Sequence, residues 1–347
     1  MLRRALLLSV VLGTLAACAS TPAVPVGSRL DDLEARLEGP APFDSLAFNF
    51  LVVGDWGRNG FFNQSDVARG MGEIGAELGS RFTVSTGDNF YISGVESVDD
   101  PKWQLSYERI YTAPALQSRW YSVLGNHDWQ GEIQPQIDYT QVSDRWYMPA
   151  RYFSETLAVN DTTDVLFVFL DTTPLSEPDE NRRKYENTEL WDRDRQTAWL
   201  DSTLATSTAA WKIVYGHHPI YVGSTSYRDN EALIERIVPI LEARGVQAYF
   251  AGHDHNLQHH RPQGANVDYF VSGAGSLTRG VVQTPNTLFA LRVPGFMAVS
   301  MARNRMFVNA YDEDGQLVYA TEVPRRRGDR LPLPFGIGNA SATTGAP

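Results

Sequence analysis

The stretch FNFLVVGDWG, residues 48–57, joins a six-residue run, apolar except for Asn49, to a glycine and then to a potential metal ligand, Asp55. A short apolar run that ends in a turn is typical of a buried β-strand. Side chains at the carboxyl ends of such strands converge on one crevice of an α/β sheet. Four later runs end in the same way, with a glycine followed by Asp, Asn or His: STGDNFY (85–91), VLGNHD (123–128), VYGHHP (214–219) and FAGHDH (250–255). The five units therefore predict one polar site at one edge of a sheet.

The remaining pattern indicates the fold class. Apolar residues recur at helical spacing in residues 67–78 and again in residues 233–244, between strand-like runs. After residue 265, four apolar runs follow one another with only turns between them, which is typical of antiparallel strands. We predict an α/β fold in which two mixed β-sheets pack together, with helices outside.

Composition excludes one class of function. The chain of 347 residues has 30 basic and 41 acidic residues and a formal net charge of −11. A protein that binds nucleic acid without sequence preference usually needs a basic face, so we expect no nucleic-acid partner. A hydrophobic content of 43% with eight tryptophans indicates a chain that can bury a large ordered core.

Residues 1–18 have the features of an export signal. A short apolar run follows Arg3 and Arg4 and ends in LAAC, whose Cys18 is the only cysteine. This sequence resembles a bacterial lipoprotein box, so we expect a lipid anchor on Cys18 as the only link to a membrane. Because Ala19 is not the Asp that retains some lipoproteins at the inner membrane, we expect the outer membrane, facing the periplasm. The alternative is cleavage after Ala19, which would leave the protein free in the periplasm.

Three further segments complete the predicted organisation. Residues 19–46 form a linker with a short helix, residues 47–323 the catalytic domain, and residues 324–347 a disordered tail. The sequence does not indicate the oligomeric state.

The residue types in the five units select a class of metal. Taken singly, an Asp or Asn after a strand is usually a turn residue, but five such units in one chain indicate a shared site. Without a second cysteine, the donors are the oxygen and nitrogen atoms of Asp, Tyr, Asn and His, which suit first-row metals. They suffice for two ions that share a carboxylate, and the hard anionic phenolate of Tyr91 favours Fe³⁺ at one of them.

These motifs resemble the calcineurin-like metallophosphoesterase superfamily, and specifically the purple acid phosphatases of the small, mammalian tartrate-resistant type. The resemblance spans roughly residues 47–326 and rests on VGDWG, GDNFY, VLGNHD, GHHPIY, GHDHNLQ and VSGAG. Many relatives in the superfamily carry Asp-x-His in the first motif, whereas Trp56 and Gly57 follow Asp55 here. In the purple acid phosphatases the tyrosine of GDNFY, here Tyr91, replaces that histidine. The resemblance implies a four-layer α/β/β/α sandwich.

The resemblance also implies a ligand set and a reaction. It implies hydrolysis of small phosphate monoesters by in-line attack of a metal-bound hydroxide, with Fe³⁺ at one site. Fe²⁺, Zn²⁺ or Mn²⁺ would occupy the other site, and Asp88 would bridge the two ions. Transferred position by position, the Fe³⁺ ligands are Asp55, Asp88, Tyr91 and His255, and the ligands that complete the second site are Asn126, His217 and His253.

The acid that protonates the leaving group is less well defined. His127 is the candidate for that role or for stabilising the transition state, although it could instead orient a ligand. Ser226 stands where the mammalian enzymes carry a second active-site histidine, so its neighbours Tyr227 and Arg228 are candidates for phosphate binding. We expect His218 to orient a ligand rather than to bind a metal.

The stretch GHDHNLQHH carries two further expectations. His253 and His255 are expected on extended backbone with their rings side by side, each toward a different ion. His259 and His260 are expected beyond the site, in a loop or orienting a ligand, and without a ligand role of their own.

The charged segment 177–190 is open to two interpretations. It either covers the site, as a loop does in the mammalian enzymes, or it is a solvated surface loop.

Two alternative functions remain. One is a phosphodiesterase or nucleotidase on the same dimetal core. The other is a non-catalytic metal- or phosphate-binding lipoprotein, which the intact ligand set disfavours.

Overall fold

The computed structural model describes residues 48–185 and 187–325. The expected signal peptide, the linker with its short helix, and residues 326–347 of the expected tail lie outside the described residues. Within the described part of the chain, no helix is long and apolar enough to cross a membrane.

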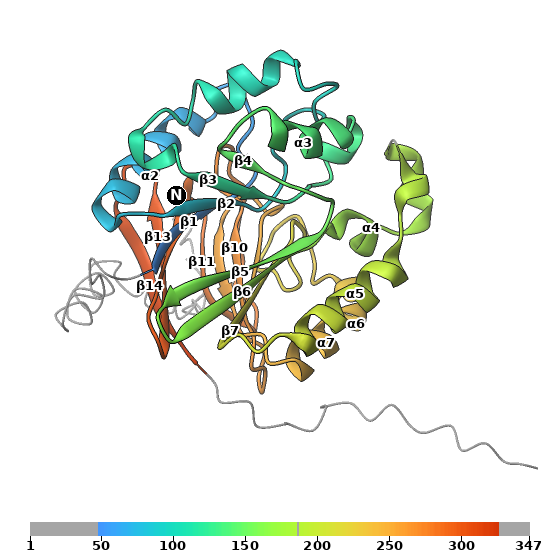
Figure 1. Ribbon diagram of the computed structural model, residues 1–347, viewed down its shortest axis with the longest axis vertical. Helices are drawn as coiled ribbons and strands as arrows, with labels where there is room; N and C mark the ends of the chain where they lie inside the picture. Colours follow the sequence, from blue (N-terminus) through green and yellow to red (C-terminus); the bar gives the residue numbers. More distant parts are fainter. Residues whose placement is uncertain (1–47, 186, 326–347) are drawn as a thin grey trace, which may run out of the picture. The chain divides into compact units, whose positions relative to one another are not determined.

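The first sheet has seven strands in the order β14-β13-β12-β1-β2-β3-β4 (Figure 1). The β1–β4 half is parallel, and the half from β1 to β14 is antiparallel. Its strands are β1 (Phe48–Val53), β2 (Phe82–Ser85), β3 (Arg119–Ser122), β4 (Trp146–Tyr147), β12 (Gly295–Met301), β13 (Arg305–Asp312) and β14 (Leu317–Pro324).

The second sheet also has seven strands, in the order β11-β9-β10-β8-β7-β6-β5. Strands β10, β8, β7 and β6 are parallel, and antiparallel strands flank them on both sides. The strands are β5 (Phe153–Asn160), β6 (Thr163–Phe169), β7 (Trp211–Tyr215), β8 (Ala248–Ala251), β9 (Leu257–His260), β10 (Asp268–Ser272) and β11 (Thr287–Leu291).

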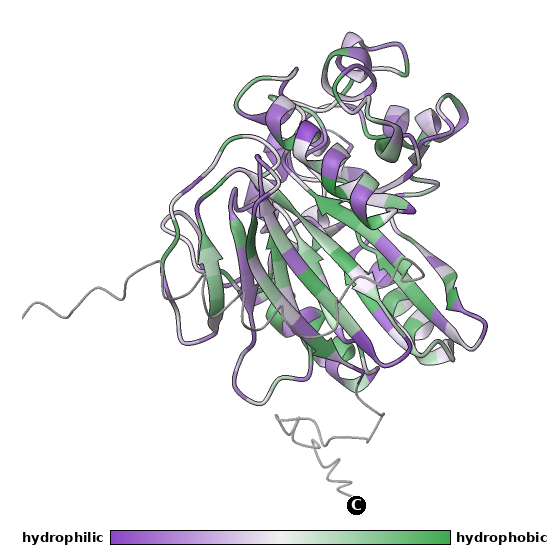
Figure 2. Ribbon diagram, turned by 90° about the vertical axis from the view of Figure 1, so that its left-hand side faces the viewer, coloured by the Kyte–Doolittle hydropathy of each residue, from purple (hydrophilic) through white to green (hydrophobic). Residues whose placement is uncertain are grey.

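Aromatic side chains fill the space between the sheets. Phe48 and Phe50 of β1 lie 6.3 Å and 5.4 Å from the ring of Phe167 on β6, and Tyr121 of β3 stacks on Phe169 of β6 at 5.6 Å. Such pairs contribute roughly 0.5–1.5 kcal/mol each beyond the area they bury. Figure 2 shows the hydrophobic residues concentrated along the strands. This packing fixes the two sheets face to face.

Helices cover the outer faces of both sheets. Helix α2 (Gln64–Leu78) packs on β1, β12 and β13, while α5 (Arg193–Thr206), α6 (Glu231–Arg236) and α7 (Val238–Ala243) share a second apolar cluster with the outer face of the second sheet. Two short helices, α3 (Gln134–Asp138) and α4 (Thr172–Ser176), lie in connections. The layers confirm the predicted α/β/β/α sandwich.

The structure corrects three details of the predicted elements. The helix expected at residues 233–244 is two helices, because Pro239 occupies the first turn of α7, where its missing N–H costs nothing. Strand β10 is not part of the late antiparallel series; it joins the second sheet parallel to β8. Pro324, expected to start the disordered tail, is the last residue of β14.

Candidate metal centre

The five strand–glycine units lie at the carboxyl ends of β1, β2, β3, β7 and β8, and the structure brings their polar side chains together. In two of the turns the glycine is required by close approach. A Cβ on Gly125 would lie 2.3 Å from the backbone nitrogen of Asp88, and one on Gly252 would lie 2.4 Å from Oδ2 of Asp55. These glycines therefore let neighbouring turns meet.

The turns also hold one another through backbone donors. The N–H of His253 donates to Oδ2 of Asp55 at 2.8 Å, and the N–H of His127 donates to Oδ1 of Asp88 at 2.8 Å. Both Asp55 and Asp88 have positive φ angles, 61° and 50°, which Asp tolerates better than most residues. Each carboxylate is thus fixed by the turn that supplies another candidate ligand.

The first cluster gathers around the phenolic oxygen of Tyr91. That oxygen lies 2.9 Å from Oδ2 of Asp88, 3.1 Å from Oδ1 of Asp55 and 3.2 Å from Nε2 of His255. Burial, together with the two carboxylates, raises the pKa of Tyr91 well above its usual value of 10.0. Four buried donors converge here, three of which are anionic or can become so, and this set fits a hard trivalent cation.

The second cluster gathers around Nε2 of His217. This atom lies 3.2 Å from Oδ1 of Asn126, 3.2 Å from Nδ1 of His253 and 3.3 Å from Oδ1 of Asp88. The other ring nitrogen of His217 donates to the carbonyl of Thr86 at 2.8 Å, which turns Nε2 toward the cluster. The donor atoms fit a first-row divalent ion.

The carboxylate of Asp88 favours a positive charge on His217. Burial disfavours a charged His217, but the carboxylate of Asp88 outweighs it and raises the pKa of His217 to about 9. A divalent ion would compete with a proton for Nε2, because this nitrogen must be free of a proton to bind metal.

His127 lies at the open side of both clusters. Its Nδ1 donates to the carbonyl of Ile92, so Nε2 points toward Asp88, 4.0 Å from Oδ2. The side chain is 24% exposed, whereas Asp88 is almost fully buried. Among the candidate site residues, His127 therefore combines contact with the cluster and access to an incoming molecule.

His218 lies behind the second cluster. Its Nδ1 meets Oγ1 of Thr172 at 3.1 Å, and the same hydroxyl accepts the backbone N–H groups of His217 and His218. The ring of His218 is also close enough to His217 and His253 to count with them as a third nitrogen donor. Thr172, at the start of α4, fixes the turn that carries both histidines.

The loop after β7 places Tyr227, rather than Arg228, against the cluster. The ring of Tyr227 lies 4.5 Å from that of His253, and its hydroxyl accepts a hydrogen bond from Arg279. Arg228 is exposed, and its guanidinium donates to the carbonyl of Tyr227. Ser226 is exposed as well. Tyr227 also lines an open depression of about 920 Å³.

The GHDHNLQHH stretch differs from the expectation in two respects. His253 is not extended, because its φ of 67° places it in the left-handed region. His259 and His260 are not loop residues; they end strand β9 and are fully buried. His259 lies 2.9 Å from Asp268 and 2.8 Å from the hydroxyl of Tyr319. Between β10 and β11, β9 has a partner on each side, which explains the burial.

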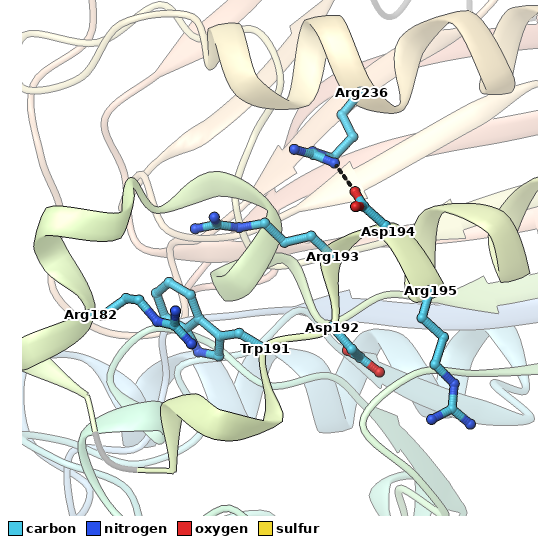
Figure 3. Close-up of a pocket in the computed structure, with 7 residues that line it drawn as sticks. All are labelled: Arg182, Trp191, Asp192, Arg193, Asp194, Arg195 and Arg236. Carbon is cyan, nitrogen blue, oxygen red and sulfur yellow. Dashed lines mark hydrogen bonds and ion pairs between the residues drawn. The ribbon is translucent and has the colours of Figure 1, made fainter.

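The charged segment 177–190 packs beside the turn that carries His127. Trp191, which follows it, has the guanidinium groups of Arg182 and Arg193 each 5.1 Å from its ring (Figure 3). The ring of Trp191 also lies 6.3 Å from that of Trp129. Tyr185 is buried against Trp191 at 5.8 Å. Aromatic contacts therefore anchor the segment, through Trp191, beside Trp129, two residues after His127.

Two arginines near the clusters were missed by the sequence argument. Arg58 stacks on Tyr91, and Arg279 binds Tyr227. Neither lies in a strand–glycine unit, so only the tertiary structure connects them with the site.

Comparisons with known proteins agree with this geometry. A family model described as calcineurin-like phosphoesterase matches residues 48–257. Purple acid phosphatase 4 of Arabidopsis thaliana is 39% identical over 315 residues, which cover 84% of this chain and 89% of the relative. Tartrate-resistant acid phosphatase type 5 of Homo sapiens is 30% identical over 318 residues, which cover 85% of this chain and 95% of the relative.

A solved structure shows the same fold. GAP50, the anchor in the inner membrane complex of Plasmodium, superposes with a TM-score of 0.72 at 24% identity, over 82% of this chain and 91% of that chain. The predicted resemblance is therefore confirmed: the chain belongs to the calcineurin-like phosphoesterases and, within them, to the purple acid phosphatases, and it is a dimetal phosphoric monoester hydrolase.

Proposed function

We propose that this phosphatase holds Fe³⁺ at the Tyr91 cluster and Fe²⁺, Zn²⁺ or Mn²⁺ at the His217 cluster. The Fe³⁺ ligands are Asp55, Asp88, Tyr91 and His255, and Asp88 also serves the second ion together with Asn126, His217 and His253. The proposal rests on the convergence of the seven donors: the phenolic oxygen of Tyr91 and Nε2 of His217 have the other five donor side chains 2.9–3.3 Å away. Asp88 is the common member because its two oxygens face different clusters.

The two ions, when bound, supply the positive charge that attracts the phosphoryl group and activates water. The protein residues hold the groups that contact the phosphate ester in place. His127 is held by its bond to the Ile92 carbonyl with Nε2 toward the clusters, so in its protonated form it can donate a hydrogen bond or a proton at Nε2 to a bound phosphate ester. Thr172 supports this arrangement by binding the ring of His218 and the backbone N–H of His217, which fixes the turn that carries both histidines.

The substrates proposed here are small phosphate monoesters. A monoester carries up to two negative charges and a diester only one, so the cationic centre attracts the monoester more strongly. The depression beside Tyr227 can receive the alcohol part of the ester, and its lining joins apolar Val222 and Val282 to the charged side chains of Arg228 and Glu231. This mixture favours no single alcohol, which agrees with a broad specificity.

Hydrolysis of p-nitrophenyl phosphate and of bis(p-nitrophenyl) phosphate tests the substrate class. The two esters release the same phenol, so kcat/KM compares only the charge and size at phosphorus. We expect the monoester to be preferred by about 10²-fold or more, which corresponds to roughly 3 kcal/mol. A preference for the diester would instead support the phosphodiesterase alternative.

We further propose that the protein is exported and anchored by a lipid on Cys18, with the periplasmic face of the outer membrane as its location. The support is the sequence alone: two arginines, a short apolar run and the LAAC box. Labelled fatty acid should enter the protein in its bacterial host and be lost in Cys18→Ser. Labelling that persists in the variant would contradict the proposal, since the chain has no other thiol.

A further inference from the structure

Arg58 stacks on the ring of a candidate iron ligand. Its guanidinium carbon lies 3.6 Å from the ring centroid of Tyr91, well inside the range of about 6 Å over which a cation is attracted to an aromatic face. The oxygen of the same ring lies among Asp55, Asp88 and His255. The cation therefore contacts the π system of the residue whose oxygen faces the first cluster.

The stacked position of Arg58 is built into the fold at both ends of the residue. Its Nε donates to Oγ of Ser276 at 3.2 Å, and that hydroxyl donates to the carbonyl of Asp55. Its backbone N–H donates to Oε1 of the buried Gln64 at 3.0 Å. Arg58 is thus fixed between the Asp55 turn and the start of α2.

The charge of Arg58 is not neutralised by an ion pair. Across residues 48–185 and 187–325, no carboxylate lies within salt-bridge distance of its guanidinium, whereas Arg145, Arg151 and Arg193 all have such partners. The nearest aromatic rings are those of Tyr91 and, at 5.8 Å, Phe62. The positive charge therefore acts mainly on the Tyr91 ring.

We propose that Arg58 is a positioning residue that weakens the electron donation of Tyr91 to the metal ion it holds. A cation on the face of a phenolate stabilises the electrons of the ring, because the negative ring face attracts positive charge. Since the guanidinium touches the ring itself, it stabilises those electrons more than it affects an ion beyond the phenolic oxygen. This inference rests on the proposed function, in which Tyr91 binds Fe³⁺.

Two consequences have a defined sign. The phenolate-to-iron charge-transfer absorption needs more energy when the donor electrons are stabilised, so Arg58 moves it to shorter wavelength. Weaker donation together with a nearby positive charge also makes Fe³⁺ easier to reduce, so Arg58 raises the reduction potential.

The visible spectrum of the iron-loaded protein tests the proposal. Arg58→Met keeps an apolar side chain and removes the charge, so its band should move to longer wavelength, by something on the order of ten nanometres. Its reduction potential should become more negative. Arg58→Lys keeps the charge but not the planar stacking, so a smaller shift in the same direction is expected.

Arg279→Met is the matched control, because Arg279 is also a cation beside the site but contacts Tyr227 rather than Tyr91. Its band should stay at the wild-type position. An unmoved band in Arg58→Met at full iron content would overturn the proposal. A band that keeps its wavelength and loses intensity would also overturn it, since Arg58 would then only hold Tyr91 in place. A wild-type protein that binds iron but has no such band would instead overturn the assignment of Fe³⁺ to Tyr91.

Discussion

Asp88→Asn is expected to lower kcat/KM for a phosphate monoester by at least about 10³-fold and to remove most of the bound metal. Among the described residues, Asp88 alone presents oxygens to both clusters, with Oδ2 at Tyr91 and Oδ1 at His217. The amide is neutral and offers one oxygen in place of two charged ones, so it binds the two cations much more weakly than the carboxylate. A loss of 10³-fold corresponds to roughly 4 kcal/mol of transition-state stabilisation, within the contribution expected of metal ions.

The control for this prediction is a second buried carboxylate. Asp268 is fully buried and is hydrogen-bonded by His259 and Arg261, which are not residues of the two metal clusters. Asp268→Asn should reduce stability but keep metal content and kcat/KM near the wild-type values. Metal analysis, circular dichroism and kinetics on the same samples separate loss of metal from loss of fold. Wild-type metal content and turnover in Asp88→Asn would contradict the shared-ligand role.

The parts of the fold that the sequence predicts well are those that local pattern determines. The runs at residues 48–53 and 82–85 are mostly apolar, and both form strands that are buried on both faces, β1 and β2. The convergence of the site follows from the same pattern, since five strands of two sheets end in a glycine and a polar side chain. The structure brings all seven predicted donors together for this reason.

The features that sequence pattern misses depend on pairing between distant segments. The run at residues 268–272 gives no sign of whether it continues the late antiparallel series or joins β8, because both neighbours offer equivalent backbone groups. The mostly polar sequence LQHH suggests a loop, yet its residues form strand β9, which is buried because strands flank it on both sides. The stacking of Arg58 on Tyr91 joins residues 33 positions apart and has no periodic signal.

One of the buried histidines of β9, His260, makes the folded protein less stable in acid. Burial, with a smaller effect of His259, lowers the pKa of His260 from 6.5 to about 4 in the folded protein. Its Nε2 meets Oε1 of Gln258, and within the described structure its Nδ1 is buried without a hydrogen-bond partner. A proton on this ring would therefore bring an unpaired charge into the interior.

The sign of the pH dependence follows from the two pKa values. Between pH 6.5 and about 4 the unfolded chain binds a proton at His260 that the folded protein does not, so acid favours unfolding. The contribution of His260 is complete above pH 6.5, is lost as the pH falls through this window, and levels off near pH 4. The full loss from this one residue is about 3 kcal/mol.

His260→Gln should remove most of this acid sensitivity while keeping a neutral hydrogen-bond donor. Urea unfolding followed by tryptophan fluorescence at pH 7 and pH 4.5 measures the free energy of unfolding at both pH values. The fall between them should be smaller by about 2–3 kcal/mol in the variant than in the wild type, even if the variant is less stable at pH 7. Thr287→Ser, at the strand position paired with His260, is the control. Neither threonine nor serine titrates, so this variant should show the same fall in the free energy of unfolding as the wild type. An equal fall in His260→Gln and the wild type would show that the ring titrates normally in the folded protein, and that the acid limit of this enzyme is set elsewhere.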